Sequence, residues 1–449
     1  MLLKLSRFFV YTAVFSVVVV LARTFFPFIG GKYYFFRICV ELGIIFFALW
    51  WGFEASAGEV KKLFKPLLKN PLFILVSVFA IVFVLAALFA DDPKVAFWSN
   101  YERGEGGFQM LHYYAFFLLL VLLFRDEQKW KTLFVYSLVA AALMIGYGLI
   151  AQLGSTGSIT FISPYGADPP PTFWGKLASA RFQGSLGNPA YVAPYLMFAI
   201  FFALYLWLAP LTKKIWSWRG VGYIALALSF LFFFVLSQTR GALLGLGASL
   251  ILYFLILALS RQNFRKPALL GLAIVLVAGG LLIANRNSGF VRALPGSRIF
   301  NISFGEQTVK TRLWTWGSAW RGFKDRPILG WGPENFSTVF DKHFDIRHYI
   351  PGQNSETWFD RAHGVLFDYL AETGILGLLA YIGIFAAFAW EFFKNGLSNG
   401  RSPAAAALFP AILGGYLVQG LVLFDVLPIY LNIFIVLAMS VYIFSHESR

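Results

Sequence analysis

The residues best suited to chemistry are two arginines near predicted helix starts. Arg240 opens one apolar run, and Asn188, followed by Pro189, opens another, with Arg181 shortly before it. Asn is a good N-cap and Pro suits the first helical turn. A helix start presents free backbone N–H groups and a partial positive charge, and a guanidinium can clamp a phosphate through two hydrogen bonds. The pattern predicts a phosphate or diphosphate site, although plain capping and arginines extended to the membrane surface also fit it.

A third feature is His363, which follows Asp360-Arg361-Ala362 and precedes an apolar run. A neutral histidine at a membrane surface can take a proton from an attacking hydroxyl near pH 7. A structural histidine at a loop–helix junction fits the same residues. Arg103, in a Gly-rich connection, could join the anion site or simply be solvated. No HExxH pattern or other His/Asp/Glu spacing typical of metal ligands occurs, so we expect no metal and no cofactor.

The amino-acid composition indicates which kind of secondary structure positions these residues. The 449-residue chain is 59% hydrophobic and only 13% charged, with a mean hydropathy of +0.69. Soluble domains usually carry about 25% charged residues. The composition excludes a secreted disulfide scaffold, a disordered protein and an ordinary soluble enzyme. It predicts an all-α polytopic membrane protein, because runs such as 72–90 are long enough to cross about 30 Å of hydrocarbon.

Apolar runs between charged or Gly/Pro-rich breaks predict about twelve transmembrane helices in a single integral membrane domain over residues 1–449. The expected spans are 8–28, 33–53, 71–90, 108–124, 132–153, 189–210, 221–236, 241–259, 267–284, 374–392, 403–424 and 427–445. Lys4 and Arg7 precede the first run without a small-residue cleavage site, so we expect a retained helix there.

Basic residues concentrate in alternate short connections, and positive charge marks the cytoplasmic side of a membrane. We therefore expect both termini in the cytoplasm. The net charge of +15 indicates membrane topology and anionic lipid rather than nucleic acid as a partner.

The longest connection, residues 285–362, is predicted to lie on the outer, periplasmic face between the ninth and tenth spans. Disordered segments contain few aromatic residues, so the many Trp residues of this segment indicate ordered structure. Leu313, Trp316, Trp320 and Phe323 recur at helical spacing, so we expect an amphipathic helix on the membrane surface. Anchoring of this helix among lipid headgroups is the simpler reading of its Trp and Arg residues.

Several short motifs, by their order along the chain and their predicted position in the membrane, resemble the O-antigen ligase and O-antigen polymerase superfamily of membrane glycosyltransferases. The resemblance covers roughly residues 95–430. The motifs are Arg103-Gly-Glu-Gly106, Gly184-Ser-Leu-Gly-Asn-Pro189, Ser237-Gln-Thr-Arg-Gly241, Lys310-Thr-Arg-Leu-Trp314, Leu329-Gly-Trp-Gly-Pro333 and the run from His363 to Gly377.

The resemblance implies a GT-C-like helical fold, a glycan donor on undecaprenyl diphosphate, and metal-free transfer to a hydroxyl acceptor outside the cytoplasmic (inner) membrane. It implies that Arg240 and Arg312 hold the diphosphate and that His363 activates the acceptor. The remaining candidates for binding diphosphate or glycan are Arg181, Asn188, Arg103, Trp316 and Glu372. The chain departs from the family at Gly364, where the usual residue after the histidine is Asn, and at Thr239, where Ser is common.

These observations predict an O-antigen ligase-like glycosyltransferase of lipopolysaccharide biosynthesis, with lipid A core oligosaccharide as the expected acceptor. One catalytic base with attack from the opposite face predicts a single displacement with inversion. A repeat-unit polymerase and an O-linked protein oligosaccharyltransferase would share the donor chemistry and differ in the acceptor. A flippase for lipid-linked glycans is the alternative from another class, but such transporters place ionisable groups at the bilayer midplane.

Overall fold

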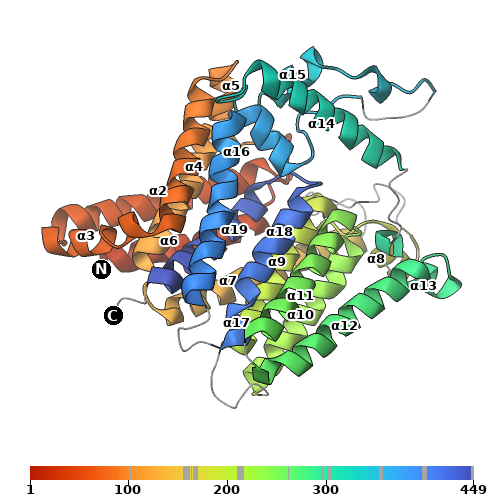
Figure 1. Ribbon diagram of the computed structural model, residues 1–449, viewed down its shortest axis with the longest axis horizontal. Coiled ribbons are helices and arrows are strands. Elements are labelled where there is room, and N and C mark those ends of the chain that lie inside the picture. Colours follow the sequence, from red (N-terminus) through yellow and green to blue (C-terminus); the bar gives the residue numbers. More distant parts are fainter. Residues whose placement is uncertain are drawn as a thin grey trace.

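The computed structural model shows that the chain folds as helices (Figure 1). It describes residues 1–100, 103–154, 162, 164, 170–209, 217–260, 262–294, 297–300, 306–352, 357–396 and 402–445. No strand occurs among these residues. The predicted all-α polytopic class is confirmed.

Within the described ranges, ten helices are long and apolar enough to cross a membrane. They are α2 (Gly30–Phe53), α4 (Pro71–Leu88), α7 (Glu127–Leu153), α9 (Pro189–Leu208), α10 (Trp218–Leu236), α11 (Arg240–Ser260), α12 (Gln262–Ala284), α16 (Val365–Glu391), the pair α17 (Pro403–Ala406) and α18 (Leu408–Gly420), and α19 (Leu427–Ser445). A shorter apolar helix, α6 (Gly107–Leu123), occupies the predicted fourth span. Eleven of the expected spans thus coincide with an apolar helix.

The first span differs from its prediction over 8–28. Helix α1 (Leu2–Ala13) continues only as the 3-10 segment η1 (Val14–Val18), and Val19 is already extended. Residues 17–20 are four consecutive valines, whose branched side chains are restricted in a helix, and Pro27 follows. The prediction of a full span was therefore wrong in extent, because hydrophobicity alone does not sustain a helix through this run.

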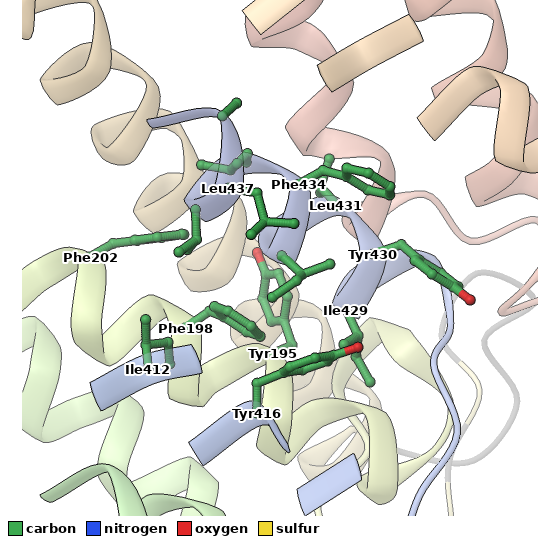
Figure 2. Close-up of a cluster of buried hydrophobic side chains, with 14 of the residues drawn as sticks. Tyr195, Phe198, Phe202, Ile412, Tyr416, Ile429, Tyr430, Leu431, Phe434 and Leu437 are labelled. Atoms are coloured by element: carbon green, nitrogen blue, oxygen red, sulfur yellow. The ribbon is translucent and has the colours of Figure 1, made fainter. Parts of the chain in front are cut away.

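The core of the bundle is formed by α9, α18 and α19. In the most apolar windows of these helices, 94% of α19 and 83% of α9 are buried, against 6% of α12. Figure 2 shows Tyr195 and Phe198 of α9 close to Tyr416 of α18, and Phe198 contacts Tyr416 with ring centroids 6.3 Å apart. Helix α12 is therefore peripheral, and the central helices form a rigid base for the polar segments at their ends.

Between α12 and α16 the chain forms short helices, as predicted for residues 285–362. They are α13 (Gly289–Ala293), η4 (Ser297–Phe300), α14 (Gln307–Asp325), α15 (Phe336–Lys342) and η5 (Ile346–His348), while residues 301–305 and 353–356 lie outside the described ranges. In Figure 1, α14 and α15 lie at one end of the bundle next to α16. The predicted helix over 313–323 is confirmed as α14. Its buried face consists of small residues such as Ala319 and Gly322, whereas Leu313 and Trp320 are exposed.

Helix α16 is broken at Gly374, which has φ +63° and ψ −162°. The turn before α15 fills the break: the N–H of Trp331 donates to the carbonyl of Ala371 (2.9 Å), and the N–H of Ile375 donates to Pro327 (2.8 Å). A Cβ on Gly374 would lie 2.4 Å from the carbonyl oxygen of Ile328. The predicted span began at residue 374, whereas α16 begins at Val365. Its first half carries acidic side chains toward His363.

Candidate active site

His363 lies at the junction of the 285–362 segment with α16, in a left-handed backbone conformation with φ +57°. Its ring packs edge-on between Phe359 and Phe424, with centroid distances of 5.3 and 5.2 Å. Its Nδ1 lies 3.1 Å from the carbonyl oxygen of Arg361. Because a carbonyl oxygen only accepts, the neutral ring carries its hydrogen on Nδ1, and Nε2 keeps a lone pair.

Electrostatics favour the neutral form of this histidine. Burial lowers the pKa of His363, and the positive charges of Arg312 and Arg103 lower it further. The backbone hydrogen bond to Arg361 and the negative charge of Asp360 oppose this decrease in pKa. The net direction is downward, so His363 is uncharged at pH 7 and can accept a proton.

Arg103 is fixed beside His363 by an ion pair that the sequence did not reveal. Its guanidinium donates two hydrogen bonds to Asp360 (2.7 and 3.0 Å) and one to the Tyr191 hydroxyl (3.1 Å). It also stacks over Phe424, 5.1 Å from the ring centroid. Burial alone would raise the pKa of the Asp360 carboxyl. The hydrogen bonds and positive charge of Arg103 lower this pKa, and the net direction is downward. Arg103 is therefore a fixed cation near the histidine.

The turn that carries Arg103 is anchored through Glu105. The carboxyl oxygens of Glu105 accept hydrogen bonds from the Tyr113 hydroxyl and from the N–H of Leu427, both at 2.8 Å. Burial raises the pKa of Glu105 to about 8. A neutral, hydrogen-bonded carboxyl thus connects this turn to the start of α19.

A fully buried arginine precedes the histidine by two residues. Arg361 pairs with Glu334 and donates to both carboxylate oxygens of Glu372, each at 3.1 Å. Glu372 also accepts the N–H of Glu334 (3.2 Å), and its side chain is only 1% exposed. The next residue, Ala362, donates its N–H to Asp368 of α16 (2.6 Å).

Helix α14 brings Arg312 and Trp316 to the same region. The charge of Arg312 acts on His363, as noted above. Trp316 stacks on Phe367 at 4.9 Å with nearly parallel rings. A Cβ on Gly364 would lie 3.0 Å from the Trp316 indole nitrogen and 2.9 Å from the carbonyl oxygen of Leu421. A side chain at position 364 would therefore meet the Leu421 carbonyl and the Trp316 ring, and glycine avoids this contact.

The remaining candidates form a second group at the starts of α9 and α11. Arg240 pairs with Glu306, the residue before α14. Arg181 donates to the carbonyl of Ser237 (3.0 Å) and to the Thr239 hydroxyl (3.1 Å), and Asn188 caps α9.

The Thr239 hydroxyl donates in turn to the carbonyl of Pro189 (3.0 Å), which connects the two helix starts. Arg181 and Asn188 thus already have structural partners, whereas Arg240 binds a carboxylate in the way it would bind a phosphate oxygen.

Several residues of the site had no clear signal in the sequence. Asp360 and Arg361 are visible as charges before an apolar run, but nothing local indicates that they bind Arg103, Glu334 and Glu372. Glu334 follows a Gly-Trp-Gly-Pro turn and has φ +63°, which is uncommon for a non-glycine residue. For the described part of the chain, no cluster of three or more His, Cys, Asp or Glu side chains could hold a metal ion.

The fold and site define a multi-pass helical membrane protein with a neutral histidine beside fixed arginines at one end of its bundle. Comparison with known proteins shows which proteins the chain is similar to. Residues 224–382 match the sequence model described as O-antigen ligase, a range that includes Arg240, Arg312 and His363. The chain is also 25% identical over 372 residues to the O-antigen ligase of Salmonella typhimurium strain LT2, covering 80% of each protein. The predicted resemblance to the O-antigen ligase family is confirmed.

Proposed function

We propose that this protein is an O-antigen ligase-like glycosyltransferase that moves a glycan from undecaprenyl diphosphate to a hydroxyl of lipid A core oligosaccharide. The reaction takes place at the periplasmic face of the bacterial inner membrane, with both termini in the cytoplasm and segment 285–362 outside. The observation that carries the proposal is the neutral His363 beside Arg103 and Arg312, within a chain similar to O-antigen ligases.

His363 is the general base in this mechanism. Its Nδ1–H is held by the carbonyl of Arg361, so Nε2 takes the proton of the acceptor hydroxyl. The hydroxyl oxygen then forms a bond to the anomeric carbon. The bond from that carbon to the diphosphate oxygen breaks, and the diphosphate leaves with the electron pair. One displacement inverts the configuration at the anomeric carbon.

The arginines stabilise the leaving diphosphate. Charge grows on this group as the glycosidic bond breaks, and fixed guanidinium groups can neutralise it without a metal. Arg312 lies on α14 and Arg240 at the start of α11, so the two come from different helices. In this proposal a phosphate oxygen of the donor replaces the Glu306 carboxylate on Arg240.

Arg103, Trp316, Arg181, Asn188 and Glu372 have different parts in this proposal. Arg103 stacks on Phe424, which also packs against His363, and Trp316 lies against Gly364, so in this proposal both contact the glycan or diphosphate. Arg181 and Asn188 shape the starts of α9 and α11 through their hydrogen bonds. Glu372 is buried against Arg361 and acts on the site indirectly, through that arginine.

The test is glycan transfer by the purified protein in detergent, with an undecaprenyl-diphosphate-linked glycan, lipid A core oligosaccharide and a chelator of divalent metals. We expect transfer by the wild type and a loss of about 10²- to 10⁴-fold for His363→Ala, because a general base contributes that much. His343→Ala is the matched control, since His343 pairs with Asp325 at the C-terminal end of α14, and its replacement should leave transfer unchanged.

Two outcomes would contradict the proposal. Transfer that persists in His363→Ala would make this histidine structural. Movement of donor across liposomes without glycan transfer to lipid A core, another glycan or a peptide would favour a flippase. Transfer to a glycan chain or to a Ser/Thr peptide alone would instead reassign the protein as a polymerase or a protein oligosaccharyltransferase.

A further inference from the structure

The ion triad Glu334–Arg361–Glu372 is the most deeply buried charge cluster near His363. Exposed fractions of its side chains are 2%, 9% and 1%. Removing charged groups from water costs free energy, and apolar residues of similar volume packed in the same place often give an equally stable fold. Two carboxylates surround one guanidinium, so the three side chains need a specific geometry to be tolerated. Stability of the fold therefore does not explain why these three residues are charged, and we look for a role in the site.

The triad holds the backbone that ends in His363. The carbonyl of Arg361 receives the Nδ1–H of His363, and the N–H of Ala362 donates to Asp368 (2.6 Å). His363 itself has φ +57°, a conformation that is unfavourable for a non-glycine residue unless its surroundings enforce it. With Arg361 bound on both sides, the peptide before His363 has little freedom to relax.

The same triad reaches the turn that carries Arg103. Glu334 accepts a hydrogen bond from the Ser99 hydroxyl (3.0 Å), and the Ser99 oxygen accepts the N–H of Glu105 (3.1 Å). Arg103 lies between these two residues in the chain. One cluster therefore connects the turn before α6, the turn before α15 and the start of α16.

We propose that Glu334, Arg361 and Glu372 are positioning residues that fix the distance and orientation between His363 and Arg103. This inference rests on the proposed function for its kinetic consequence. None of the three touches the reacting atoms. They act by holding the base and the cation in one geometry, so that the acceptor hydroxyl meets Nε2 while the diphosphate meets the arginines.

The kinetic test compares Glu372→Gln and Arg361→Lys with the wild type in the transfer assay. Glutamine keeps the shape of Glu372 and removes its charge, and lysine keeps the charge but loses the guanidinium fork. A displacement of about 1 Å can reduce turnover about 100-fold. We expect kcat to fall toward that extent while KM for the donor changes little, because Arg240 and Arg312, which hold the diphosphate in the proposed mechanism, are not replaced.

Arg347→Lys is the matched control, since Arg347 pairs with Asp345 on an exposed turn and its side chain is 62% exposed. The double variant Arg361→Lys/Glu334→Gln tests rescue. It removes the carboxylate that a single lysine leaves unpaired, so it should recover part of the kcat lost in Arg361→Lys.

A second measurement does not depend on transfer. The rate at which diethyl pyrocarbonate modifies His363, followed by mass spectrometry, reports how firmly the ring is held. We expect faster modification in Glu372→Gln than in the wild type, with His343 as the internal reference. Unchanged kcat and an unchanged modification rate in a folded variant would overturn the inference. Absence of transfer in the wild type would overturn the proposed function, while the modification rates still decide the positioning role.

Discussion

At the scale of single residues, the site depends on charges of opposite sign acting on one imidazole. Arg312 and Arg103 lower the pKa of His363 beyond the effect of burial, and Asp360 raises it. Arg103 and Asp360 also bind each other. Neutralising one or the other should therefore shift the pKa of His363 in opposite directions, which a general loss of structure would not do.

A pH profile of kcat/KM for Asp360→Asn and Arg103→Gln tests this opposition. A base works only when unprotonated, so activity is lost as pH falls through the pKa of His363. Asp360→Asn lowers that pKa, and the acidic limb should move to lower pH. Arg103→Gln raises it, and the limb should move to higher pH. Shifts of both variants in the same direction would show that neither charge acts on His363 directly.

At the scale of elements, the break in α16 decides where the acidic side chains of its first half lie. Gly330, Gly332 and Gly374 all have positive φ, and the turn from Pro327 to Gly332 donates and accepts hydrogen bonds within the break. The helix can therefore change direction without leaving backbone groups unsatisfied in an apolar environment. Glu372 reaches Arg361 from the half before the break.

Replacing Gly374 by alanine should destabilise the break in α16. Its φ and ψ lie in a region that is essentially restricted to glycine, and the new Cβ would collide with Ile328. We expect destabilisation of about 2–3 kcal/mol, seen as a lower melting temperature in detergent. Gly146→Ala in α7 is the control, because open space surrounds Gly146 and the change should be neutral or slightly stabilising. Equal melting temperatures for the two variants would contradict the role given to the break.

At the scale of the whole molecule, the proposed reaction requires one orientation in the membrane. Basic residues such as Lys62, exposed on α3 (Ala57–Phe64), belong to the predicted cytoplasmic side. Lys324, exposed on α14, belongs to the opposite side together with His363. The charge pattern predicts this orientation because positive residues in short connections are retained in the cytoplasm.

Cysteine labelling checks the orientation. Cys39 is buried, and replacing it by serine leaves a background without cysteine. In spheroplasts, a membrane-impermeant maleimide should label Lys324→Cys directly and Lys62→Cys only after permeabilisation. The reverse pattern would place His363 in the cytoplasm and exclude a periplasmic reaction.

The sequence alone determined most of the helices and the similarity to O-antigen ligases. Long apolar runs must become helices in a membrane, because lipid satisfies no backbone hydrogen bonds, and this requirement is local to each run. The run over 8–28 is the exception, since its valines and Pro27 favour other backbone conformations. The order of motifs such as Ser237-Gln-Thr-Arg240 likewise stands in the chain itself, and it predicted the resemblance that the comparison confirmed.

Only the tertiary structure decided which charges meet. Arg103 binds Asp360, which is 257 positions away, and Ser99 binds Glu334, which is 235 positions away. Such pairs depend on how the helices pack and on the break at Gly374, and no local pattern encodes them. The sequence predicts that Glu372 binds substrate. In the structure Glu372 is buried and pairs with Arg361, which is buried with it. Residue types and order therefore predict the chemistry, and packing sets its geometry.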